Sequence, residues 1–258
     1  MRTPVGRRRS AAAVFPAIAA VTLAVMAAGC AGDPVSAPAP RGPADMVLSA
    51  AGLPPGFTAA PLSVSDLVAG NKGALGAAAS ARITPEFCRP TADTALNPQL
   101  TADNSAVLAA RDGDTANLVE VVTTIPRDVD ADRLTTTGRC SRTTTEITRG
   151  NLAGTRVSTE YTELALPDIA GGLLAGEQML LTRSEVTTTL PDGGVRRQIG
   201  FAGYAVLDRP ASGPATVQLT VTGAPTPATD PPTEPVEPID AAGFTRLFDA
   251  AVERVTTP

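Results

Sequence analysis

The sequence predicts an α+β domain: an antiparallel sheet of about five to six strands with helices packed on one face. Two observations carry this prediction. In residues 215–223, Val217, Leu219 and Val221 alternate with threonine and glutamine, which gives a strand one buried and one solvated face. In residues 239–255, apolar side chains recur at helical spacing, so a final helix has an apolar side that must cover the sheet.

The first half of the domain contains these elements in order. Residues 44–57 predict a short helical start and then a turn. Residues 63–80 predict a weak helix or a loop with helical turns, because each of three glycines costs a helix about 1 kcal/mol relative to alanine. Residues 105–111 and 117–125 flank a short Asp-Gly-Asp-Thr turn and predict a β-hairpin.

A short helix is expected next, over residues 127–140, with Asp128 or Asp130 as its N-cap. Residues 155–166 are a further strand candidate.

The clearest hairpin comes from residues 177–190 and 195–208, on either side of Pro-Asp-Gly-Gly. Residues 223–238 are rich in proline, which lacks a backbone N–H, so we expect an exposed loop there.

The first 29 residues have the organisation of an export signal. A basic start is followed by an apolar run, and small residues at 27, 28 and 29 directly precede Cys30. This ending resembles the lipobox of bacterial lipoproteins, in which a diacylglyceryl group is attached to the cysteine, the preceding peptide is removed and the new N-terminus is acylated. We therefore expect lipidation of Cys30. The alternatives are secretion after ordinary signal cleavage and an uncleaved anchor, against which Pro16 and the short apolar run count.

This interpretation divides the chain into three parts. Residues 1–29 are a lipoprotein signal peptide, residues 30–43 are the lipidated cysteine and a proline-rich tether, and residues 44–258 are a single α+β extracytoplasmic domain. The prolines of the tether favour extended backbone at about 3.1 Å per residue. The tether would thus hold the domain some tens of Å from the lipid surface.

The three cysteines of the chain fit the same interpretation. An exported protein in an oxidising compartment is expected to pair Cys88 with Cys140. Lipidation of Cys30 accounts for the odd cysteine. A thiolate nucleophile or a metal site lacks support, because the chain has no histidine and no Cys-x-x-Cys spacing.

Composition excludes several functional classes. The formal net charge is −5 and no basic cluster lies in the body of the chain, which argues against nucleic acid as a partner. The absence of histidine excludes Ser-His-Asp triads. A Ser–Lys dyad would depend on Lys72, the single lysine, which lies in the glycine-rich stretch. We expect no enzyme activity, no catalytic residues and no cofactor.

One acidic cluster resembles the first half of an EF-hand calcium loop: Asp128, Asp130 and Asp132. Arg133 and Arg139 stand where that loop requires glycine and glutamate, so we interpret the cluster as an acidic helix start and expect no metal.

The candidate ligand face lies on and beside the long hairpin. Arg196, Arg197 and Tyr204 are side chains that could contact a polar or anionic ligand. The alternative is a solvated sheet face rich in β-branched threonine. Small residues in the same strand would let a helix or a ligand approach closely, and we expect a cavity there: Gly200, Ala202 and Gly203.

The layout of the chain resembles a family. With its lipobox cysteine, "LPPGF", "ITPEFCRPT", late strands and a final "FTRLFDAAVERV" helix, it resembles actinobacterial, mycobacterial-type envelope lipoproteins that are similar to the extracytoplasmic sensor domains of receptor-type serine/threonine kinases. The resemblance implies a mixed α/β sensor domain with a cleft, and it supplies no catalytic residues. Such sensor domains usually carry two disulfides, whereas this chain can form one.

The leading functional hypothesis is a lipid-anchored envelope lipoprotein on the extracytoplasmic face of the cell membrane. Its domain would bind a small molecule, an envelope component or a protein, without catalysis. One alternative is a structural or accessory lipoprotein that docks on a membrane protein complex. Another is a lipid carrier, which would need a closed apolar cavity beneath Phe201 and the final helix.

Overall fold

The computed structural model describes residues 41–166, 178–209, 212–228 and 234–257. Contacts divide the chain into two units, Met1–Pro38 and Ala39–Pro258, and all the described residues belong to the second. Cys30, the signal sequence and most of the tether therefore lie outside the described residues. Among the residues that are described, no helix is long and apolar enough to cross a membrane.

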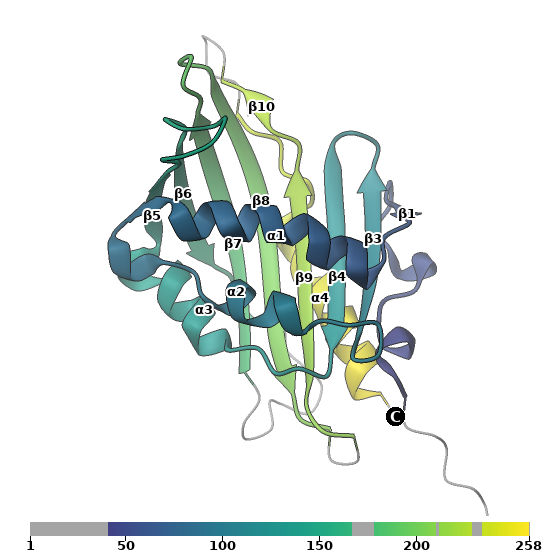
Figure 1. Ribbon diagram of the computed structural model, residues 1–258. Coiled ribbons are helices and arrows are strands. Elements are labelled where there is room, and N and C mark those ends of the chain that lie inside the picture. The colour runs from purple at the N-terminus through teal and green to yellow at the C-terminus, as the bar shows by residue number, and fades with distance from the viewer. Residues whose placement is uncertain (1–40, 167–177, 210–211, 229–233, 258) are drawn as a thin grey trace, which may run out of the picture. The chain divides into compact units, whose positions relative to one another are not determined.

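A single antiparallel sheet forms the centre of the second unit (Figure 1). Nine strands follow the spatial order β1-β3-β4-β9-β8-β7-β6-β5-β2, and β10 pairs with β8. The ten strands found in the described residues are β1 (Thr58–Ala60), β2 (Arg82–Thr84), β3 (Ser105–Asp112), β4 (Ala116–Thr123), β5 (Arg142–Glu146), β6 (Arg156–Glu163), β7 (Gln178–Thr189), β8 (Val195–Leu207), β9 (Ala215–Gly223) and β10 (Thr226–Pro227).

Helices lie on both faces of the sheet. Figure 1 shows α4 behind the strands and the other three α-helices in front. The α-helices are α1 (Val64–Ser80), α2 (Ala92–Leu96), α3 (Val129–Thr136) and α4 (Ala241–Thr256). Short 3₁₀ turns complete the fold: η1 (Pro43–Asp45), η2 (Ala50–Gly52), η3 (Glu86–Cys88), η4 (Asn97–Gln99) and η5 (Gly138–Cys140).

The prediction of a sheet of five to six strands with helices on one face is therefore wrong. The structure is mostly sheet, with ten strands and helices on both faces. Three of the missed strands, β1, β2 and β10, have two or three residues, which is too short to show a period of two. The fourth, β5, is rich in threonine and lacks apolar alternation. Strand β10 also lies within the segment expected to be a loop, where Pro227 is tolerated because β10 has one partner strand.

The back face of the sheet, toward α4, holds the hydrophobic core. Phe201 and Phe244 stack with ring centroids 5.2 Å apart. A Cβ atom on Gly203 would lie 2.5 Å from the ring of Phe248, so glycine is what lets α4 approach β8 there. The three aromatic rings thus occupy the region beneath Phe201 and α4 where a lipid carrier would need a closed cavity.

The front face of the sheet is more polar. On β9, Val217, Leu219 and Val221 point toward α4 and are buried, as the alternation predicts. The opposite side of this strand is not solvated throughout. Thr216 is fully buried beneath the segment before α3, where its hydroxyl donates to the carbonyl of Ile125 at 2.7 Å. Loops and helices on this face cover part of the threonine-rich surface.

Helix α1 forms despite its glycines. Ser63 Oγ accepts the backbone N–H of Asp66 at 3.1 Å, and the Asp66 carboxylate accepts the N–H of Ser63 at 3.3 Å. This reciprocal capping box fixes the start of the helix. Val64 is the one buried residue of α1, so the helix lies across the front face with most of its length exposed.

Candidate functional site

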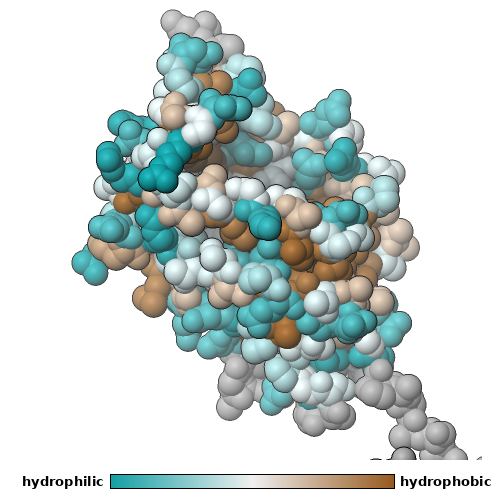
Figure 2. Space-filling view, viewed as in Figure 1, coloured by the Kyte–Doolittle hydropathy of each residue, from teal (hydrophilic) through white to brown (hydrophobic). Residues whose placement is uncertain are grey.

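A groove of about 730 Å³ lies between α1 and the chain around η4, which follows α2. We call it the α1 groove. Its volume falls within the usual range of small-molecule sites. Figure 2 shows apolar side chains gathered below the right-hand half of α1. The apolar residues that line the groove include Val64, Val68, Leu75, Pro98 and Leu100.

The rim of the groove carries hydroxyl groups and one charge. Ser65 and Lys72 come from α1, while Thr94 of α2 and Thr101 after η4 lie on the opposite wall. No aspartate or glutamate is among the described residues that line it. The α1 groove is therefore an apolar trough with a single cation at its edge.

A smaller cavity of about 160 Å³ lies behind the groove, against β4 and β9. Asn97 and Leu100 line both cavities and form the wall between them. The wall is held in place because Asn97 Nδ2 donates to the carbonyl of Val68 at 3.3 Å and Asn71 Nδ2 donates to Asn97 Oδ1 at 3.2 Å. We call this second space the inner cavity.

Buried Arg127 lies beside the inner cavity and joins the surrounding elements. Its Nε and Nη2 donate to the two carboxylate oxygens of Asp132 at 2.6 and 2.9 Å. Its Nη1 donates to Asp93 at 2.7 Å and to Gln218 at 3.0 Å, and the guanidinium lies 4.1 Å from the ring centroid of Tyr204. These contacts tie α2 and α3 to β8 and β9. The cation is fully engaged by protein groups.

The ionisation of this cluster suits a structural role. Burial opposes the charge of Arg127, but the hydrogen bond to Asp132 and the nearby carboxylates outweigh it and raise the pKa above the usual arginine value. Burial also raises the pKa of Tyr204 and of Tyr161 above that of a free phenol. Both phenols are therefore neutral at physiological pH and are poor nucleophiles or bases.

The structure does not bring the three residues of the predicted ligand face together. Arg196 is exposed on the front side of β8. Arg197 has the opposite parity and donates to Glu185 at 3.2 Å, while Tyr204 lies on the front side under Arg127. The small residues of β8 also separate by parity. Gly203 admits α4 at the back, whereas Gly200 faces front, where a Cβ atom would lie 3.1 Å from both Ser184 Oγ and Thr222 Cγ2.

Cys88 and Cys140 form a disulfide with a Cα–Cα distance of 5.4 Å. It joins η3 to η5, and both residues are buried. Within the described part of the chain, no group of three or more His, Cys, Asp or Glu side chains is placed to hold a metal ion.

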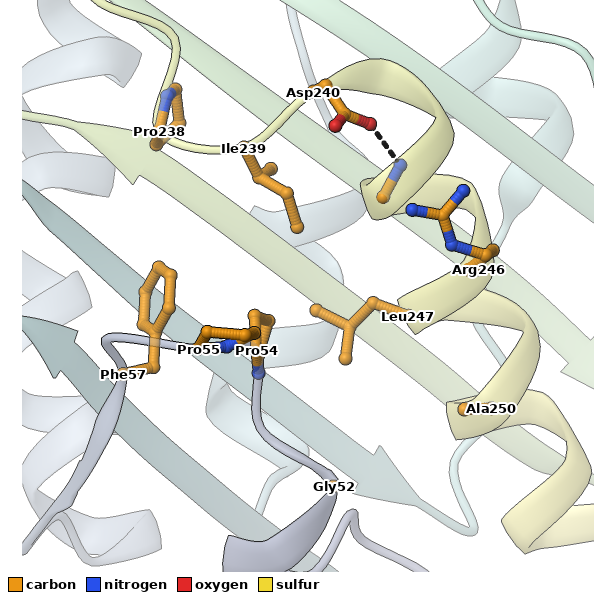
Figure 3. Close-up of a pocket in the computed structure, with 11 residues that line it drawn as sticks. Gly52, Pro54, Pro55, Phe57, Pro238, Ile239, Asp240, Arg246, Leu247 and Ala250 are labelled. Atoms are coloured by element: carbon orange, nitrogen blue, oxygen red, sulfur yellow. Dashed lines mark hydrogen bonds between the residues drawn. The ribbon is translucent and has the colours of Figure 1, made fainter.

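A further pocket, of about 510 Å³, lies between α4 and the segment after η2 (Figure 3). Figure 3 shows Phe57 and Leu247 pointing into it, with Arg246 on α4 at its edge. Asp240 is occupied as the N-cap of α4, where it accepts the N–H of Gly243. This pocket is smaller than the α1 groove, and the helix beside it is anchored in the core.

Sequence reasoning did not identify the α1 groove. The available signal was the spacing of Val64, Val68 and Leu75 on one side of a glycine-rich helix, which is equally typical of a helix packed on a core. Comparisons with family models, with curated proteins and with solved structures find no match for this chain.

Proposed function

We propose that this protein is a lipid-anchored, extracytoplasmic binding protein whose domain holds an apolar ligand in the α1 groove without catalysis. The membrane anchor is Cys30, on the evidence of the residues that precede it. The domain would sense or capture its ligand at the membrane surface, as the resemblance to envelope sensor domains implies.

The observation that carries the proposal is the apolar lining of the α1 groove beneath a mostly exposed helix. A helix of 17 residues that buries one of them contributes little to the core, which is built around α4. Exposed apolar surface of this kind is typical of ligand or partner sites. The polar side chains described along the groove are hydroxyls, the Asn97 amide and the Lys72 ammonium, a set that suits the binding of a ligand.

Binding can be tested with a neutral apolar fluorophore such as N-phenyl-1-naphthylamine. A chain that begins at Ala31 keeps the whole core, because every core side chain lies between Met46 and Val255. We expect this chain to enhance the fluorescence of the probe saturably. Val68→Glu places a charge inside the groove and should weaken binding about tenfold or more.

The matched control is Val236→Glu, because Val236 is 66% exposed and lies outside the groove. It should leave the affinity for the probe unchanged. Equal loss in both variants, or no saturable binding by the parent chain, would contradict the proposed site.

The anchor is tested separately in cells. Cys30→Ala should release the protein from the membrane fraction or block its maturation, because it removes the only thiol outside the disulfide. The fraction bound to membranes is measured by centrifugation and immunoblotting. An unchanged membrane fraction would count against lipidation.

A further inference from the structure

We infer that the ligand of the α1 groove is an amphiphile with one linear apolar chain and an anionic head group, a carboxylate or a phosphate, held by Lys72. This inference rests on the proposed function, since it specifies the chemistry of the ligand in the same groove. Three features of the groove carry it: its length, its charge and the freedom of the lysine.

The groove is long. Its lining follows α1 from Val64 to Leu75, and eleven residues of helix rise correspond to about 16 Å. Apolar side chains lie along this length on α1, and Pro98 and Leu100 face them from the other wall. A long trough of this kind fits an extended alkyl chain better than a compact ring system.

The charge of the groove has one sign. Lys72 is the single lysine of a chain that has 26 acidic and 21 basic residues, and no acidic residue is among those described along the groove. The ammonium of Lys72 at the edge can pair with an anionic group, while the apolar walls hold the rest of the same molecule. The hydroxyls of Thr94 and Thr101 offer further donors to a head group.

Lys72 is also free to take a ligand. No carboxylate of the described residues lies within ion-pair distance of it, in contrast to Arg127, whose guanidinium is shared between Asp93 and Asp132. Its side chain is exposed, so replacing it should leave the fold intact. A loss of binding in a Lys72 variant would therefore report on the head group.

The test uses four probes with the same hexadecyl chain or its sixteen-carbon acyl equivalent: palmitate, hexadecyl phosphate, monopalmitoylglycerol and hexadecyltrimethylammonium. Each is tested, below its micelle concentration, for displacement of the neutral fluorophore from the chain that begins at Ala31. We expect the two anionic probes to bind about tenfold more tightly than either the neutral or the cationic one. Comparison of palmitate with the phosphate identifies the preferred anion.

Lys72→Met should abolish the preference for the anionic probes and leave the affinity for monopalmitoylglycerol unchanged. Arg149→Met, which removes the same charge from an exposed turn, should retain the preference. Equal binding of anionic and neutral probes by the parent chain, or a preference that survives Lys72→Met, would overturn the head-group inference while leaving the groove as the site. Failure of every probe to bind would overturn the proposed function itself.

Discussion

The two faces of the sheet differ in how firmly their helices are held. On the back face, α4 buries six residues, and its Phe244 and Phe248 pack on β8 at Phe201 and Gly203. On the front face, α1 is one residue longer than α4 and buries only Val64. The hydrophobic core therefore lies on the back face, whereas α1 on the front face is held by few buried side chains and can open more easily.

Both faces bury charged residues, and Arg127 on the front face differs from Glu120 on the back face in how many partners it has. Arg127 on the front face has two carboxylates, an amide oxygen and an aromatic ring as partners. Glu120 on the back face is fully buried, and its Oε2 accepts the N–H of Leu48 at 2.8 Å. Its Oε1 has no hydrogen-bond partner among the described residues. Burial raises the pKa of Glu120 to about 7, although the Leu48 N–H and the charge of Arg254 oppose the rise.

The largest effect is expected from Arg127→Met. The variant leaves Asp132 buried beside an uncharged side chain, and breaking a buried ion pair in this way costs about 3 to 5 kcal/mol. The free energy of unfolding, measured by urea titration, is the readout. Arg142→Met is the control, because its pair with Glu160 is exposed and should cost less than about 1 kcal/mol. Similar costs for the two variants would show that the Arg127 cluster does not hold the front helices.

A smaller, pH-dependent effect is expected at Glu120. The pKa of its carboxyl in the folded state, about 7, lies above the ordinary value of 4.5, so the folded state keeps a proton that the unfolded state loses in this window. This stabilising contribution is complete below pH 4.5 and is lost as the pH rises through 7. The expected loss is on the order of 3 kcal/mol.

Glu120→Gln keeps an acceptor for Leu48 and does not titrate. We expect the free energy of unfolding of this variant to lack the Glu120 contribution between pH 5 and 8, with a gain over the parent at pH 8. Glu86→Gln, at an exposed position, should retain the pH dependence of the parent. If the free energy of unfolding changes with pH in the parent as it does in Glu120→Gln, burial does not raise the pKa of the Glu120 carboxyl.

The smallest effect is expected from a substitution inside α1. Gly73 lies inside α1, and a Cβ atom there would meet nothing within 4 Å, so Gly73→Ala should stabilise α1 by about 1 kcal/mol. We expect amide hydrogen exchange in α1 to slow about fivefold, with little change in global unfolding. Gly203→Ala, by contrast, should destabilise the whole domain, because its Cβ would clash with Phe248. If Gly73→Ala raised the free energy of global unfolding by the same amount as it stabilises α1, the two faces of the sheet would unfold together.

Local pattern alone determined several elements of this fold. The hairpins predicted over 105–125 and 177–208 are present as β3–β4 and β7–β8, and the last apolar repeat forms α4. The helix expected within 127–140 spans Val129–Thr136, with Asp128 as its N-cap. These elements were predictable because periodicity, turns and caps act between residues that are neighbours in the chain.

The tertiary structure decided the rest, because the decisive contacts join distant parts of the chain. Strand β2 has three residues and exists only because β5, about 60 residues later, pairs with it. Arg127 takes Asp93 and Gln218, which are 34 and 91 residues away, as partners. The same holds for the proposed ligand site. In the sequence, Val68 and Lys72 are ordinary positions of a weak helix. Only the tertiary structure shows that Leu100 lies opposite them across an open groove.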